Sequence, residues 1–282
     1  MNANTLKAND YRTDLKPIWC PRCGDYGFLS ALYKVFEMNQ QPPHETVIVS
    51  GIGCSSRLPG FVNAYGFHGL HGRILPVAMG IKLANPRLKV IGIGGDGDGL
   101  AIGMGHFIHA IRRNLDVLYV ILDNNIYGLT KGQGSPTTQA SHRTQSDPFG
   151  IEGDPIDPVP LALSAGAGFV ARIYTGQMQN MMKILPQAFA YPGFALVHAL
   201  SPCTVFHDTY EHYNSAVRML PDDFQPTTLD RAHEYGASKE PIYTGVFYNR
   251  PRATLLQRVE KTISAHHKTS VTALDVARGW RG

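Results

Sequence analysis

The chain has few charged residues and no strong excess of either sign. Only 17% of its 282 residues are charged, and the formal net charge is +4. Because Lys and Arg are also scattered, the sequence lacks the basic patch that nucleic-acid binding requires. We therefore expect no nucleic-acid partner, and the small positive charge favours at most an acidic protein partner.

Long apolar runs are missing as well. The first residues, MNANTLKANDYRTDLK, contain no apolar stretch that could form the core of a signal peptide. No stretch of about 18 uncharged apolar residues occurs elsewhere. We therefore expect a cytoplasmic protein that does not associate with membranes. The 43% of hydrophobic residues is enough for an ordinary globular core.

Cysteine is scarce, with only Cys20, Cys23, Cys54 and Cys203. In a reducing compartment, four cysteines favour thiolate ligands or buried thiols over disulfides. The pair in WCPRCG has metal-ligand spacing and, alone, is typical of half a zinc site. The second pair of a zinc ribbon is also closely spaced, however, whereas Cys54 and Cys203 are single and distant. The spacing therefore leaves zinc and an iron–sulfur cluster both open.

Short apolar runs alternate with segments of helical periodicity. The runs predict strands at 46–50, 88–95, 116–123, 169–174 and 194–200. The periodicity predicts helices after the cysteine pair and at 74–84, 106–113, 161–168 and 177–190. This alternation predicts an α/β fold, a mainly parallel sheet with helices on both faces.

Two segments do not fit this alternation. Residues 132–160 are rich in Gly, Pro, Ser, Thr and Gln and lack periodicity, and a loop of that length is usually functional. After about residue 205 the composition is mixed. We therefore assign residues 1–205 to the main domain and residues 206–282 to a C-terminal extension that packs on this domain or on a partner subunit.

The stretch GIGGDGDG permits two interpretations. Gly92, Gly94 and Gly97 match the G-x-G-x-x-G motif of dinucleotide-binding proteins, and Asp123 ends the next strand, where an acidic residue would bind a ribose. Asp96, however, would place a carboxylate where a pyrophosphate needs uncharged backbone. A divalent cation between Asp96 and a diphosphate would remove that conflict.

The second interpretation is therefore a magnesium–diphosphate site. Mg²⁺ prefers octahedral oxygen coordination and usually binds one or two protein groups together with phosphate oxygens and water. Asn124 lies 28 residues after Asp96 (124 − 96) and offers a side-chain carbonyl, while Ile126 offers its backbone carbonyl. These ligands converge if the strands before Asp96 and Asn124 are neighbours in the sheet.

A GDG followed after about 25 to 30 residues by NN resembles the thiamine-diphosphate fingerprint. The segment GDGDGLAIG…LDNNIYGLTKGQ is similar to the β subunit of 2-oxoacid:ferredoxin oxidoreductases of the 2-oxoglutarate type. CPxCG, GIGCSSR, YGFHGLHGR and YGLTKGQ occur in the family's order, so the resemblance covers roughly residues 17–205. It implies the thiamine-diphosphate-binding fold in residues 1–205, with cofactor contacts from Gly95, Asp96, Gly97, Asp98, Asn124, Ile126, Asp25 and Ser55.

The resemblance also implies two metal sites. Mg²⁺ would be bound by Asp96, Asn124 and Ile126, and one [4Fe–4S] cluster by the four cysteines, close to the thiamine ring. Cys54 and Cys203 are expected to follow the first and last predicted strands, and the carboxyl ends of parallel strands meet at one edge. A zinc-stabilised module without catalysis is the competing interpretation.

The implied reaction is the oxidative decarboxylation of 2-oxoglutarate, with coenzyme A, to succinyl-CoA and CO₂. Electrons would pass through the cluster to ferredoxin. The same chemistry on pyruvate or another 2-oxoacid is the alternative.

The second carboxylate of 2-oxoglutarate requires a cation, and Arg57 and Lys131, beside the cofactor motifs, are the candidates, with Leu129 in the same turn. Solvated surface charges are the competing interpretation for both cations. His71 is the candidate catalytic residue, although His68 and His71 could both be structural. Asp25 could instead cap the helix that follows it.

One part of the family's active site has no counterpart in this sequence. The glutamate that activates thiamine belongs to a pyrimidine-binding domain, and no second copy of such a domain is found here. The resemblance therefore implies that the chain needs an α or fused γα subunit, with the active site at their interface. The other expected partners are ferredoxin, coenzyme A and the 2-oxoacid.

Overall fold

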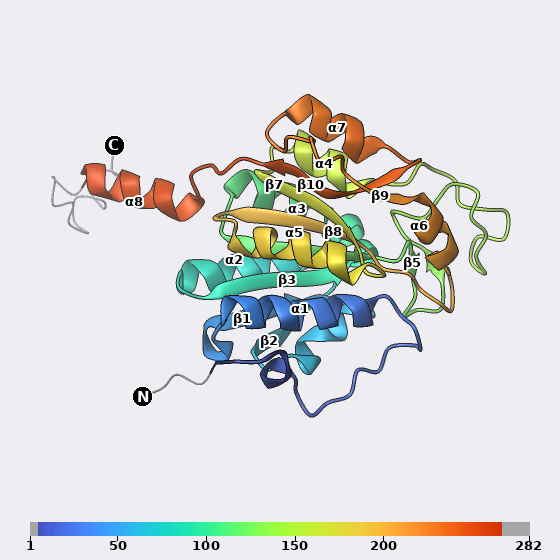
Figure 1. The fold of residues 1–282 in the computed structure, drawn as a ribbon, viewed down its shortest axis with the longest axis horizontal. Helices are drawn as coiled ribbons and strands as arrows, with labels where there is room; N and C mark the ends of the chain where they lie inside the picture. Colours follow the sequence, from blue (N-terminus) through green and yellow to red (C-terminus); the bar gives the residue numbers. More distant parts are fainter. Residues whose placement is uncertain (1–4, 267–282) are drawn as a thin grey trace, which may run out of the picture.

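The structure, a computed structural model, describes residues 5–266. Its centre is a sheet of eight strands in the order β2-β1-β3-β4-β8-β7-β10-β9 (Figure 1). These strands are β1 (Thr46–Ser50), β2 (Tyr65–His68), β3 (Lys89–Gly95), β4 (Val117–Asp123), β7 (Phe169–Tyr174), β8 (Phe194–Leu200), β9 (Val217–Met219) and β10 (Ile242–Asn249). A separate hairpin joins β5 (Ile126–Tyr127) to β6 (Gln133–Gly134).

Helices cover both faces of the sheet. They are α1 (Asp25–Asn39), α2 (Ile74–Ala84), α3 (Met104–Arg113), α4 (Pro158–Ser164), α5 (Met178–Ala190), α6 (Tyr210–Ala216), α7 (Leu229–Ala237) and α8 (Leu255–His266). Helices α1 and α5 share one hydrophobic cluster with the sheet, whereas α2, α3, α4 and α7 share the cluster on the other face. Figure 1 shows α8 projecting away from these layers.

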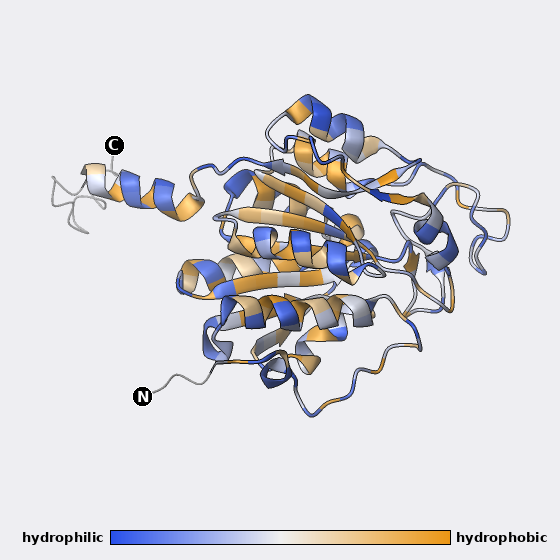
Figure 2. Ribbon diagram, viewed as in Figure 1, coloured by the Kyte–Doolittle hydropathy of each residue, from blue (hydrophilic) through white to orange (hydrophobic). Residues whose placement is uncertain are grey.

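The central strands form because both of their faces are buried. Along β4, Leu118, Val120 and Leu122 belong to the α1–α5 cluster, while Tyr119 and Ile121 belong to the opposite one. A strand covered on both sides is therefore apolar throughout, not alternating, which agrees with the hydrophobic strands of Figure 2. The predicted fold class, a mainly parallel sheet between two helical layers, is confirmed.

The direction of the strands places the loops of interest at one edge. Strands β2, β1, β3, β4, β8 and β7 pair in parallel, and β10 runs antiparallel to β7. The carboxyl ends of β1, β3, β4 and β8 therefore lie at the same edge. The segments that follow them carry Cys54, Asp96, Asn124 and Cys203.

Some elements differ from the sequence-based expectation. The helix expected at 161–168 is α4, which begins earlier because Asp157 accepts a hydrogen bond from the backbone N of Val159 and Pro158 occupies the first turn. Strand β2, which ends at His68, was not predicted from the sequence. All four residues of β2 are exposed, so the strand carries no burial pattern.

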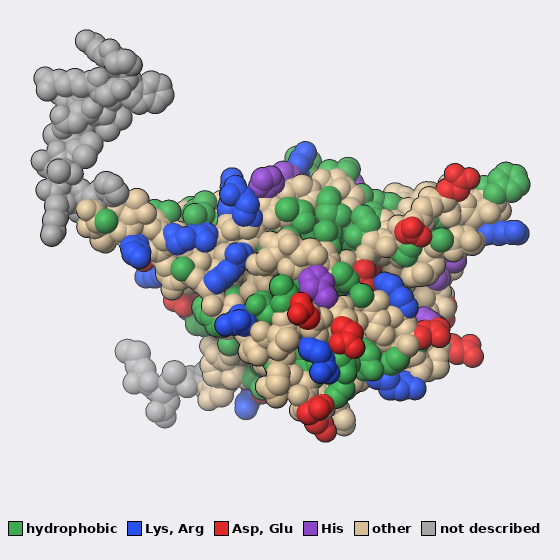
Figure 3. Space-filling view, turned by 90° about the horizontal axis from the view of Figure 1, so that it is seen from above, with side chains coloured by type: hydrophobic (Ala, Val, Ile, Leu, Met, Phe, Trp, Pro, Cys, Tyr) green, Lys and Arg blue, Asp and Glu red, His purple; other side chains and the backbone are tan. Residues whose placement is uncertain are grey.

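The segment after residue 205 contributes to the same sheet through β9 and β10, and the boundary near 205 stays a prediction. Among the described residues, no helix is both long and apolar enough to cross a membrane. The face seen in Figure 3 mixes hydrophobic, cationic and acidic side chains.

Candidate functional site

A cavity of about 430 Å³, called here the cofactor cavity, opens at the carboxyl edge of the sheet. Most residues predicted to bind the cofactor line it: Ser55, Gly95, Asp96, Gly97, Asp98, Asn124 and Ile126. His71, Leu129 and Cys54 line it too. The structure therefore brings together residues from separate segments of the chain.

Asp96 and Asn124 meet at this cavity because β3 and β4 are adjacent, with Gly95 opposite Leu122. This is the adjacency that the magnesium motif requires. The Asp96 carboxylate is buried and accepts a hydrogen bond of 2.8 Å from the Thr137 hydroxyl. Burial, followed by the nearby Asp123 charge, raises the pKa of Asp96 to about 8. Because burial and the Asp123 charge disfavour the ionised form of Asp96, a bound cation would stabilise this carboxylate.

The two other predicted magnesium ligands form a tight turn. The Asn124 side-chain oxygen accepts a hydrogen bond of 3.1 Å from the backbone N of Ile126, and the Ile126 carbonyl accepts one of 3.0 Å from Gly128. Each oxygen retains a lone pair. One carboxylate, one amide and one backbone carbonyl form a hard oxygen donor set that fits Mg²⁺ with a diphosphate.

Asp98 organises the wall of the cavity. Its Oδ1 atom accepts hydrogen bonds from the backbone N of Ile52 (2.8 Å) and of Gly72 (2.9 Å), and lies 2.8 Å from the His71 ring. A Cβ atom at Gly51 would lie 2.3 Å from this carboxylate, so the approach requires glycine. One carboxylate thus joins the loops after β1 and β2 to the turn after β3.

His71 is held in one orientation by this contact. Because Asp98 accepts the hydrogen bond, Nδ1 of His71 carries a proton, and in the neutral ring Nε2 is the acceptor. The side chain is 32% exposed and lines the cofactor cavity. His68, in contrast, lies 3.0 Å from the Ser50 hydroxyl and does not line the cavity.

A second cavity, of about 280 Å³ and called here the cysteine cavity, adjoins the first. All four cysteines line it, together with Arg57 and Lys131. The two cavities have Cys54, Asn124, Gly128 and Leu129 in common. A Cβ atom at Gly128 would lie 3.7 Å from the Cys54 sulfur and 3.8 Å from the Cys203 sulfur. Both sulfurs thus lie at the turn that carries the magnesium motif.

The four thiols are free and crowded. Burial, together with the nearby Asp25, Cys203 and Cys20, raises the pKa of Cys54 to about 11. Burial and Asp25 also raise the pKa of Cys23. Thiolates in this position need a cationic centre to offset their repulsion.

Within residues 5–266, no three His, Cys, Asp or Glu side chains are grouped around one point as a metal-ion site. In a cubane each iron binds a different thiolate, so thiols spread around one cavity fit a cluster.

Asp25 lies on the cysteine side of the site. Its carboxylate is buried and accepts a hydrogen bond of 2.7 Å from the Ser201 hydroxyl. Burial raises its pKa to about 6, although hydrogen bonds from Ser201 and Cys23 oppose this shift. The side chain does not cap α1, whose N-cap is Gly24. It is also absent from the lining of the cofactor cavity, so a contact with thiamine stays a prediction.

A buried polar network escaped the sequence analysis. Asp123 Oδ2 accepts a hydrogen bond of 2.8 Å from His198 Nε2, and His198 Nδ1 accepts one of 3.1 Å from Arg172. Arg172 also donates to both oxygens of Asp157, at 2.9 and 3.1 Å. Asp123 is thus committed to protein partners and not placed for a ribose. A useful signal was present in the strands FVARIY and FALVHAL, because a lone Arg or His in a fully buried strand needs a buried partner.

Two family models match the chain. The family model described as "Thiamine pyrophosphate enzyme, C-terminal TPP binding domain" matches residues 51–199, and thiamine pyrophosphate is another name for thiamine diphosphate. The model for the C-terminal part of the pyruvate ferredoxin oxidoreductase beta subunit matches residues 203–263.

Individual proteins are similar over nearly the whole chain. The chain is 43% identical over 258 residues to "2-oxoacid:ferredoxin oxidoreductase 1, subunit beta" of Aeropyrum pernix, covering 86% of this chain and 80% of that protein. It is 36% identical over 271 residues to "2-oxoglutarate synthase subunit KorB" of Methanothermobacter thermautotrophicus, covering 95% and 93%. The solved structure of "2-oxoglutarate:ferredoxin oxidoreductase from Magnetococcus marinus with 2-oxoglutarate, coenzyme A and succinyl-CoA bound" has a TM-score of 0.93 and 34% identity, covering 99% of this chain and 97% of that chain.

Proposed function

The chain belongs to the 2-oxoacid:ferredoxin oxidoreductase family as a β subunit, and from this we propose that it holds the thiamine-diphosphate and iron–sulfur centres of a 2-oxoglutarate-oxidising enzyme. One observation carries the proposal. The cofactor cavity and the cysteine cavity share a wall formed by Cys54, Asn124, Gly128 and Leu129. A cluster in one cavity would therefore lie beside a thiamine cofactor in the other.

The proposed reaction converts 2-oxoglutarate and coenzyme A to succinyl-CoA and CO₂. The carbon–carbon bond to the carboxylate breaks, a thioester bond forms, and two electrons pass one at a time to ferredoxin. When bound, thiamine diphosphate supplies the electron sink for decarboxylation, and a [4Fe–4S] cluster supplies the one-electron path.

This chain's own residues would hold those groups. Asp96, Asn124 and the carbonyl of Ile126 would provide the oxygens for Mg²⁺, which would offset the negative charges of the buried carboxylate and of a diphosphate. Ser55, Gly95, Gly97 and Asp98 line the same space. Cys20, Cys23, Cys54 and Cys203 would hold the cluster. His71, fixed by Asp98 with Nε2 as an acceptor, is the candidate to accept a proton at this cavity.

Two cations support a dicarboxylate substrate. Arg57 and Lys131 are exposed and both line the cysteine cavity, and Leu129 lines both cavities. Neither cation lines the cofactor cavity itself. They would bind the second carboxylate of 2-oxoglutarate where the substrate extends past the shared wall at Leu129. The Magnetococcus marinus protein is described with 2-oxoglutarate bound, and the Methanothermobacter thermautotrophicus protein is named for 2-oxoglutarate.

Partners complete the site. As a β subunit, the chain requires an α subunit, and we propose an α or fused γα subunit that supplies the pyrimidine-binding half of the active site. Ferredoxin, coenzyme A and a cytoplasmic location belong to the same proposal.

A substrate exchange tests the proposal. The complex of this chain with its α subunit is assayed without oxygen for the reduction of a viologen dye, with coenzyme A and one 2-oxoacid at a time. We expect 2-oxoglutarate to be the preferred substrate by kcat/KM. Preference for pyruvate would retain the chemistry and reject the role of Arg57 and Lys131. No reduction with any 2-oxoacid, in a complex shown to bind thiamine diphosphate, would reject the function.

A further inference from the structure

One side of the molecule is apolar over two adjoining elements. Strand β2 lies at the edge of the sheet, beside β1, and α2 follows it in the chain (Figure 1). Residues 50–81, which include β2 and most of α2, contain Arg57 and Arg73 but no Lys, Asp or Glu. The cores of protein–protein interfaces have this composition, because they are depleted in Lys, Asp and Glu and enriched in aromatic residues and Arg.

The helical layer on one face of the sheet ends before it reaches β2. In the parallel pair of β1 and β2, Tyr65 lies beside Val47. Phe67 lies beside Val49, and the partners in such a pair point to the same face. Both valines are buried in the cluster that contains α2 and α3. Tyr65 and Phe67, in contrast, are 60% and 45% exposed. The two aromatic side chains thus form an uncovered ledge beyond β1.

Helix α2 continues this apolar surface. Its one charged residue, Lys82, is buried and pairs with Asp116 at 2.8 Å. Gly80, Leu83 and Ala84 are exposed. A Cβ atom at Gly80 would meet no atom within 4 Å, so open space lies outside the helix at this point. A helix that is apolar on every side is ordinarily buried, yet among residues 5–266 no element covers the outer side of α2 at Gly80.

Exposed apolar residues also carry this surface to the rim of the cofactor cavity. Leu70 is 75% exposed, and Ile102 and Ile52 are exposed as well. A Cβ atom at Gly72 would lie 2.7 Å from Ile102, so the loop after β2 contacts the turn after β3. Ile52, like His71, lines the cofactor cavity. The surface, called here the docking face, comprises Ile52, Tyr65, Phe67, Leu70, Gly80, Leu83 and Ile102.

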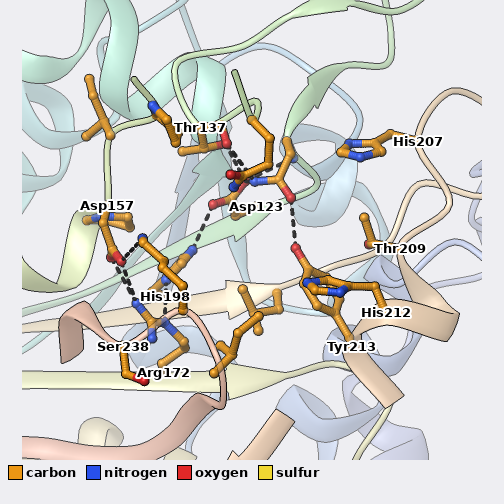
Figure 4. A pocket seen from close by; sticks show the side chains of 18 of the residues that line it. Asp123, Thr137, Asp157, Arg172, His198, His207, Thr209, His212, Tyr213 and Ser238 are labelled. Carbon is orange, nitrogen blue, oxygen red and sulfur yellow. Dashed lines mark hydrogen bonds and ion pairs between the residues drawn. The ribbon is translucent and has the colours of Figure 1, made fainter. Parts of the chain in front are cut away.

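Acidic side chains lie elsewhere on the molecule. In the pocket at the ends of β7 and β8, Asp157 accepts hydrogen bonds from Arg172, so these charges are paired within the chain (Figure 4). Asp10 and Asp14 are close in sequence to Tyr11, which packs in the α1–α5 cluster on the opposite face of the sheet. The docking face therefore presents exposed apolar side chains and no exposed acidic group of its own, and such a surface marks an interaction site.

We propose that the docking face binds the α subunit. This assignment rests on the proposed function, in which the α subunit completes the cofactor cavity. A subunit that covers the rim of the cavity at Ile52 would also reach Leu70 and Ile102, because these residues adjoin the same rim. The matching surface of the α subunit is expected to be apolar. Its binding would also protect the free edge of β2, which has no Lys or Pro to prevent pairing with other chains.

The affinity of the two subunits tests this assignment. Sedimentation velocity of the purified complex over a dilution series gives its Kd. Phe67→Ser, Leu70→Ser and Leu83→Glu should each raise this Kd by about tenfold or more, because each removes an apolar side chain from the interface. Leu229→Ser and Met38→Ser change exposed apolar residues of α7 and α1, away from the docking face, and should leave the Kd unchanged. All five side chains are exposed in the chain, so the variants should fold, which circular dichroism checks.

Two results would overturn this assignment. The first is an equal Kd for the wild type and the three variants of the docking face. The second is that these variants dissociate a contact between two copies of this chain while the contact with the α subunit keeps its Kd, which would make a second copy the occupant. Because the Kd is measured without substrate, it does not depend on which 2-oxoacid the enzyme oxidises. A failure of the proposed function is therefore distinguishable from a failure of this assignment.

Discussion

The hydroxyl oxygen of Thr137 lies 2.8 Å from the Oδ2 atom of Asp96. The same hydroxyl lies 2.7 Å from Oδ1 of Asp123, the residue that ends β4. Thr137 thus connects the residue after β3 with the end of β4, and it does so from a loop some 40 residues further along than Asp96 (137 − 96 = 41). The proposed magnesium ligand is thereby positioned by a side chain that does not line the cofactor cavity.

We predict that Thr137→Val weakens the binding of Mg²⁺ and thiamine diphosphate by about tenfold, because a hydrogen bond to a charged group contributes about 1.5–3 kcal/mol. Thr137→Ser retains the hydroxyl and should restore most of the affinity. Titration of the apo complex with thiamine diphosphate at fixed Mg²⁺ measures the effect. Equal affinity of the Val and Ser variants would show that Thr137 only fills space.

A second prediction concerns Asp157 and stability. Burial alone would raise the pKa of Asp157, but the Arg172 and Lys239 cations outweigh burial and hold it at about 2, below the ordinary value of 3.8. The ionised form therefore stabilises the folded state above pH 3.8, and this contribution is lost as the pH falls from 3.8 towards 2.

Asp157→Asn should consequently lower the free energy of unfolding by about 2 kcal/mol near neutral pH, because a pKa unit corresponds to about 1.4 kcal/mol. The difference from wild type should shrink below about pH 4. Urea unfolding at a series of pH values measures it, with the exposed Asp154→Asn as the control. A difference that stays constant down to about pH 3 would contradict the ionic explanation.

The cysteines supply a third prediction. Replacing Cys203 by Ser should reduce the iron content from about four atoms per chain to less than one, because each iron of a cubane needs a thiolate. Thr204→Ser, at the neighbouring residue, should leave the iron content unchanged. Iron and zinc are counted by atomic emission on samples purified without oxygen. If the Ser variant keeps the iron content of the wild type, Cys203 is not a ligand of the cluster.

A fourth prediction concerns the substrate's second carboxylate. Arg57→Gln and Lys131→Gln should each raise the KM for 2-oxoglutarate by about tenfold, since a charge-assisted hydrogen bond contributes roughly 1.5–3 kcal/mol. The KM for pyruvate, which has no second carboxylate, should change much less. Steady-state viologen reduction separates the two, with Lys183→Gln as the control. Equal changes for both substrates would indicate a general effect on the site.

The sequence predicted the parts of this molecule that depend on local patterns. Strands at 46–50, 169–174 and 194–200 coincide with β1, β7 and β8, because fully buried strands are apolar from end to end. The motifs around Asp96 and Asn124 likewise placed both residues at the ends of adjacent strands.

What the sequence did not predict depends on partners that are distant in the chain. His198 bonds Asp123 across 75 residues, and Thr137 bonds Asp96 across 41. Hydrophobic periodicity cannot predict such hydrogen-bonded pairs, because the two residues become neighbours only when the chain has folded and the strands are aligned. Strand β2 was missed for another reason, since its exposed residues have no burial pattern to detect.

The central claim is that a cluster lies beside thiamine diphosphate, and a visible spectrum tests it most directly. The sample is the complex with the α subunit, purified without oxygen. Its contents of iron, zinc and thiamine are measured on the same sample. The proposed function predicts a brown protein with about four irons in this chain, in addition to any that the partner carries. Its absorbance should bleach on addition of 2-oxoglutarate and coenzyme A. A chain that holds zinc and no iron, and whose complex shows no bleaching with any 2-oxoacid, would contradict the redox function and leave Cys20 and Cys23 as ligands of a structural zinc ion.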